Sequence, residues 1–164
     1  MNKFCRQLAI AACVALATAG PACAQAEHNA EHADHHAHGS GKLALDHGKK
    51  WQTDDTLRAG MEALRASFAA QHPAIDAETL SADQYKRLGE LTEKSVAQIV
   101  AKCKLAPEGD AMLHHVIADM LAGADAMQGK SKEKPNAGAR AVVHALMGYG
   151  QYFEHPGWKG LHQP

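Results

Sequence analysis

Apolar residues recur at helical spacing in four stretches of the chain, and this pattern predicts four amphipathic helices. Spacings of three and four residues place apolar side chains on one face of an α-helix. The stretches cover residues 53–72, 81–103, 107–129 and 136–153. No stretch alternates between apolar and polar residues with period two, so the pattern predicts an all-α fold.

Each stretch carries one apolar stripe that predicts a buried helix face. In chain order the stripes consist of Leu57, Met61, Leu64 and Phe68; Leu88, Leu91, Val96, Ile99, Val100 and Cys103; Leu113, Val116, Ile117, Met120, Leu121, Ala124 and Met127; and Val142, Leu146, Tyr149 and Phe153. The connections are mostly short, which makes consecutive helices antiparallel neighbours. The sequence therefore predicts an antiparallel, up-down-up-down four-helix bundle over residues 43–164.

Local residues predict where these helices begin and end. Thr53 is a good N-cap for the first helix, and His72-Pro73 should stop it because the residue before a proline avoids the α conformation. Ser81 and Gln84 have the spacing of a capping box at the start of the second helix. Asn136 is the candidate cap of the fourth helix.

The first 24 residues have the layout of a secretory signal peptide. Lys3 and Arg6 form a positive start, a short apolar run follows, and small residues lead to cleavage after Ala24 or, alternatively, Ala26. The apolar run is shorter than the ~20 residues that a spanning helix needs. The sequence therefore predicts export to the periplasm with no membrane span.

Removal of this leader changes the chemistry of the chain. Only Cys103 of the four cysteines would remain, so the mature protein has no internal disulfide and no Cys-x-x-Cys-His site for covalent haem. Loss of Lys3 and Arg6 leaves 15 basic against 18 acidic residues. This slightly acidic balance gives no reason to expect nucleic acid as a partner.

Three segments of the bundle region resemble a known group of proteins. They read "LDHGKKWQTDDTLRAGMEALR", "KCKLAPEGDAMLH" and "YFEHPGW", and together they span about residues 43–158. They resemble small exported bacterial helical proteins of the DnrO-like group. The resemblance implies a small periplasmic helical domain, and it implies no catalytic residues.

A histidine-rich segment precedes the bundle region. Residues 25–42 have no hydrophobic period and end in Gly39-Ser40-Gly41, which predicts a disordered arm and linker. Five histidines occupy eleven positions of this arm, with acidic residues between them: His28, His32, His35, His36 and His38. Neutral imidazole is the commonest protein ligand for Cu, Zn and Ni, and flanking carboxylates attract a cation. The arm therefore predicts a divalent transition-metal site, with Cu(II) favoured by the Irving–Williams order.

The sequence also leaves two further cofactor sites and another class of function as alternatives. His114 with Cys103 or Met112 is a candidate second metal site. A b-type haem clamped by Met61 and a histidine is less favoured, because His144 and His115 are expected to point away from the apolar stripes. The chain has no nucleophile elbow, phosphate-binding loop or His-Glu-x-x-His motif, so an enzyme is the least favoured class. The alternative to metal binding is an interaction module that docks on an envelope protein.

Overall fold

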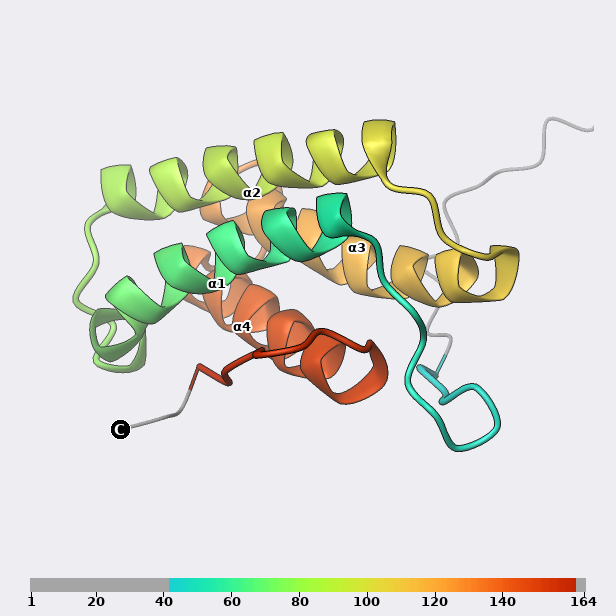
Figure 1. The fold of residues 1–164 in the computed structure, drawn as a ribbon. Helices are drawn as coiled ribbons and strands as arrows, with labels where there is room; N and C mark the ends of the chain where they lie inside the picture. Colours follow the sequence, from blue (N-terminus) through green and yellow to red (C-terminus); the bar gives the residue numbers. More distant parts are fainter. Residues whose placement is uncertain (1–41, 162–164) are drawn as a thin grey trace, which may run out of the picture. The chain divides into compact units, whose positions relative to one another are not determined.

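A computed structural model describes residues 42–161, and these contain four α-helices (Figure 1). The helices are α1 (Asp55–Asp76), α2 (Ala82–Lys102), α3 (Pro107–Met127) and α4 (Pro135–Tyr152). Consecutive helices pack against each other and run in opposite directions, and α4 also contacts α1 and α2 (Figure 1). The prediction of an all-α, antiparallel four-helix bundle is confirmed. The predicted leader and the arm as far as Gly41 lie outside the described residues.

Most residues of the four predicted stripes form the core. The largest side chains that are under 2 % exposed come from all four helices and from the residue that follows α4: Tyr149, Phe68, Phe153, Leu57, Met61, Leu64, Ile75, Ile99, Leu113, Met120, Met127 and Leu146. The prediction of burial is wrong for two stripe residues, because Val100 is 56 % exposed and Leu121 is 37 % exposed. On α2 the buried face instead includes Thr92, whose hydroxyl donates to the Leu88 carbonyl oxygen at 2.8 Å. A hydroxyl bonded back to its own helix can be buried at little cost.

The first helix begins one residue later than predicted, because Asp54 and not Thr53 is its N-cap. The Asp54 carboxylate accepts a hydrogen bond from the Leu57 backbone N–H at 2.7 Å, which is the bond expected of a cap. The Thr53 hydroxyl donates instead to the carbonyl oxygen of Glu154 in the C-terminal tail. This contact spans about a hundred residues of sequence, so local capping preferences gave no sign of it.

The prediction that α1 stops at His72-Pro73 is wrong. The helix continues through Pro73 to Asp76, and Ile75 in this last turn is 1 % exposed. His72 is also buried, and its Nδ1 lies 3.2 Å from the Asp76 carboxylate. Proline is unfavourable inside a helix. Here the burial of Ile75 and the contact between His72 and Asp76 stabilise the extra turn.

The capping box at the start of α2 is confirmed, whereas the predicted cap of α4 is wrong. Ser81 and Gln84 each bond the backbone N–H of the other. In α4 the cap position is Lys134, and Pro135 occupies the first helical position. The Asn136 side chain instead donates to the carbonyl oxygen of Ile75 at 2.7 Å and to the Tyr85 hydroxyl at 3.0 Å. Asn136 therefore joins the start of α4 to α1 and α2.

Helices α3 and α4 form the closest pair in the bundle, and two glycines make this approach possible. A Cβ atom placed on Gly138 would lie 2.5 Å from the Gly123 carbonyl oxygen and 2.7 Å from the Ala126 Cβ. A Cβ on Gly123 would meet the Gly138 carbonyl oxygen at 2.6 Å. These distances are below van der Waals contact, so the two backbones pack directly against each other only because both residues are glycine.

Within residues 42–161, no helix combines the length and the apolar character that crossing a membrane requires.

Candidate functional site

The five histidines proposed as metal ligands, His28, His32, His35, His36 and His38, lie outside the described residues. Their role as ligands, and the disorder of the segment that carries them, stay predictions. Within residues 42–161, no three side chains of His, Cys, Asp or Glu come together in a way that could hold a metal ion.

The candidate second metal site does not assemble as a cluster of such ligands in the described part of the chain. The His114 Nδ1 lies 2.8 Å from the Asp110 carbonyl oxygen, so this ring bonds its own helix. Cys103 is only half-buried and is the C-cap of α2. Burial raises the pKa of the Cys103 thiol, and the nearby carboxylates of Asp54 and Asp110 raise it further. A raised pKa keeps the thiol protonated, whereas metal binding requires the thiolate.

The directions predicted for the other bundle histidines are partly confirmed. Met61 is fully buried, and His144 is exposed on α4, as expected. For α3 the prediction is wrong, because His115 is half-buried, whereas the preceding His114 is exposed.

A cluster of aromatic rings closes the C-terminal end of α4. The Tyr149 ring stacks on Phe153 with centroids 5.2 Å apart, and the Trp158 ring meets Tyr149 edge-on at 4.9 Å. The His155 ring lies 4.9 Å from Trp158, and its Nδ1 lies 3.0 Å from the Tyr149 hydroxyl. Gly150 leaves the space that Trp158 occupies, since a Cβ there would be 2.3 Å from the indole nitrogen. Trp158 therefore folds back against the last turns of α4.

The N-terminal segment joins this cluster through its backbone. Trp51 N–H donates to the Tyr152 carbonyl oxygen at 2.9 Å, and Glu154 N–H donates to the Trp51 carbonyl oxygen at 2.8 Å. These two bonds make a parallel bridge between Trp51 and Phe153. Helical periodicity did not predict the cluster, because its ring contacts depend on how the residues after α4 fold back and on the backbone bridge to Trp51. The available signal was the density of aromatic residues in "YFEHPGW".

Charged groups around His155 act in both directions on its protonation. Burial lowers the pKa of His155, and the guanidinium groups of Arg58 and Arg65 lower it further, while the Glu62 carboxylate raises it. Glu62 is itself bonded by Arg65, which lowers the Glu62 pKa. Burial raises the pKa of Tyr149 well above its usual value, so the phenol stays protonated, and its hydroxyl shares a hydrogen bond with the His155 Nδ1. The net effect favours the uncharged imidazole.

We therefore expect the bundle to lose stability as the pH falls through the ordinary histidine range. Because the folded His155 has a lowered pKa, the unfolded chain binds its proton more readily, so unfolding becomes easier below about pH 6.5 and increasingly so down to the folded pKa. His155→Asn, which keeps an acceptor for the Tyr149 hydroxyl but cannot be protonated, should reduce this dependence. Thermal melts between pH 7.5 and 5 in the presence of chelator measure the slope. His47→Asn, at an exposed histidine, is the control, and an unchanged slope in His155→Asn would contradict the assignment.

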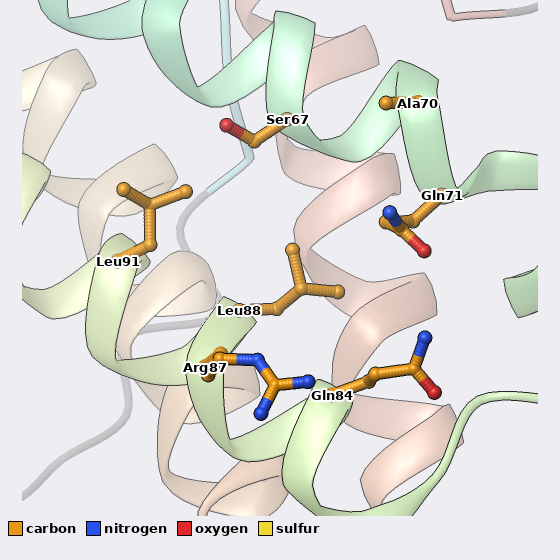
Figure 2. Close-up of a pocket in the computed structure, with 7 residues that line it drawn as sticks. All are labelled: Ser67, Ala70, Gln71, Gln84, Arg87, Leu88 and Leu91. Carbon is orange, nitrogen blue, oxygen red and sulfur yellow. The ribbon is translucent and has the colours of Figure 1, made fainter.

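A surface groove lies between α1 and α2, where their facing side chains leave a space of about 450 Å³ (Figure 2). Its lining comes from one flank of each helix: Ser67, Ala70, Gln71, Gln84, Arg87, Leu88 and Leu91. The volume falls within the ~300–1,000 Å³ of small-molecule sites. The apolar pattern did not predict this groove, since it placed Leu88 and Leu91 together in one buried stripe.

A smaller recess of about 90 Å³ lies between α1 and α4. Its polar groups include those of Asp76, Arg140 and His144. The Asp76 carboxylate lies 3.9 Å from the Arg140 guanidinium, so the charges in this recess largely satisfy one another.

Comparisons with protein-family models, with curated proteins and with solved structures find no match for this chain.

Proposed function

We propose that the chain is an exported metal-binding protein that buffers, shuttles or senses Cu, Zn or Ni in the periplasm. The observation that carries this proposal is the run of five histidines between His28 and His38, interleaved with carboxylates and without a large apolar residue. A run of imidazoles at this density can supply several nitrogens to one ion without a prebuilt cavity. The leader-like first 24 residues support export.

The proposal gives the arm and the bundle separate roles. The described residues bury a large apolar core of their own. The members of this core are distributed along the chain between Leu57 and Leu161. The arm contains no large apolar side chain, so changes in it should remove little of the area that stabilises the fold. The bundle would then act as the stable carrier, and the arm as the ligand set.

The test replaces His28, His32, His35, His36 and His38 together by Asn in the full mature chain. We expect Cu(II), Zn and Ni affinity to fall by at least about tenfold, because most of the imidazole ligands are gone. Binding to the unmodified protein should weaken between pH 7.5 and 5.5, since a protonated imidazole cannot bind a metal. Calorimetric titration at both pH values measures the affinity. The helical circular dichroism spectrum should stay the same.

A matched control replaces three histidines of the bundle by Asn while the arm stays intact. His114, His115 and His144 are exposed or half-buried on α3 and α4, so their replacement should leave the fold and the metal affinity unchanged. If this variant loses the affinity and the arm variant keeps it, metal binds to the bundle and the proposal is wrong.

A further inference from the structure

The groove between α1 and α2 exists because small side chains of one helix face leucines of the other. On this flank α1 presents Ser67 and Ala70, which are too short to cover Leu88 and Leu91 of α2 (Figure 2). Leu88 is nearly buried, and Leu91 is only half-buried. The floor of the groove is therefore aliphatic and partly open to solvent. Apolar surface left in this way gains free energy when an apolar ligand covers it.

The polar groups at one end of the groove are hydrogen-bond donors. Gln71 and Gln84 lie toward this end and Leu91 toward the other, while Arg87 lies beside Leu88 with its guanidinium directed toward Gln84 (Figure 2). The Gln84 side-chain oxygen already accepts from the Ser81 N–H at 2.8 Å, which leaves its amide N–H groups to donate. Arg87 forms no ion pair or hydrogen bond with any residue in 42–161. No carboxylate lines the groove.

We propose that this groove binds an aliphatic monocarboxylate of medium chain length. The carboxylate would lie at Arg87, whose planar guanidinium suits its two oxygens, with the amides of Gln71 and Gln84 beside it. The alkyl chain would then cover Leu88 and reach Leu91. The head group and the chain together would cover the groove from Gln84 to Leu91, which is about 10 Å along α2 at 1.5 Å per residue and suits a carboxylate of medium length. This site is separate from the proposed metal ligands, and either proposal can fail without the other.

The probes are decanoate and decyltrimethylammonium, which share an alkyl chain and differ in the sign of the head group. Each is titrated below its micelle concentration into the ¹⁵N-labelled mature protein, with chelator present. Decanoate should cause saturable shifts of the backbone amide signals of Gln71, Gln84, Arg87 and Leu91. Because the groove is open on one side, we expect a Kd of about a millimolar. The cationic probe should bind at least about tenfold more weakly.

Three variants connect the binding to the groove. Ala70→Leu should fill the aliphatic part and abolish the shifts, whereas Ala118→Leu, at an exposed position on α3, should leave them unchanged. Arg87→Gln should weaken decanoate binding by about tenfold and remove the preference over the cationic probe. Absence of saturable shifts at the groove, equal binding of both probes to the unmodified protein, or binding that survives Ala70→Leu would each overturn the proposal. Sedimentation would detect self-association of the protein. Self-association that covers Leu91 would show that a second copy of the chain, and not a carboxylate, occupies the groove, and the proposal would be wrong.

Discussion

Gly138→Ala should destabilise the bundle by about 3 kcal/mol, with a fall in Tm on the order of 10 °C. The added methyl group would meet the Gly123 carbonyl oxygen at 2.5 Å and the Met127 backbone nitrogen at 3.1 Å. Backbone atoms cannot rotate away, so α3 and α4 would have to separate. The higher helix propensity of alanine offsets only about 1 kcal/mol of this cost. Urea denaturation of the unmodified and variant proteins measures the change.

Gly148→Ala is the matched control, because it makes the same substitution elsewhere in α4. A Cβ at Gly148 meets only the end of the Leu43 side chain, at 3.4 Å, and this flexible group can move. We expect this variant to be as stable as the unmodified protein or slightly more stable. If Gly138→Ala behaved like Gly148→Ala, the close packing of α3 against α4 would be refuted.

Asp54→Ala should cost about 2 kcal/mol in the free energy of unfolding. One carboxylate oxygen accepts from the Leu57 N–H at 2.7 Å and caps α1. The other accepts from the Lys104 N–H at 2.6 Å, in the loop between α2 and α3. Loss of an N-cap costs about 1 kcal/mol, and the second charge-assisted bond adds a similar amount because Lys104 is exposed to water.

Asp54→Asn separates the two contributions of this side chain. Asparagine also caps helices well, so the bond to Leu57 should survive. Its amide would have to present an N–H group toward the Lys104 N–H, so the second bond should be lost. We expect a loss of about half that of Asp54→Ala in chemical denaturation. Equal stability of all three proteins would show that Asp54 does not connect α1 to the following loop.

The helices were predictable because the information that defines them is local. Apolar residues at spacings of three and four gave all four elements, and the capping box at Ser81 was read correctly because its two partners are three residues apart. The failures at the helix ends have a common cause. Thr53 and Asn136 use their side chains to bond residues far away in sequence, and the burial of Ile75 carries α1 through Pro73.

The candidate sites were predictable to different degrees. The arm is a feature of composition, so the sequence alone suggests its chemistry. The groove depends on which flanks of α1 and α2 face each other, and the stripe pattern did not separate half-buried Leu91 from nearly buried Leu88. The pairing of His155 with Tyr149 requires the tail to fold back along α4. Helical periodicity carries no information about such a turn.

The parallel bridge between Trp51 and Phe153 also determines how the domain would respond to mechanical load. The two segments run in the same direction, and each continues toward a different end of the chain. A force that pulls the ends apart would therefore draw the segments in opposite directions along their length. Both backbone bonds of the bridge, from Trp51 to Tyr152 and from Glu154 to Trp51, would be loaded in shear together. A protein stretched between its ends would first lose the outer contacts of Leu43 and Trp158 with α4, and this bridge would then resist the pull until its two bonds broke together.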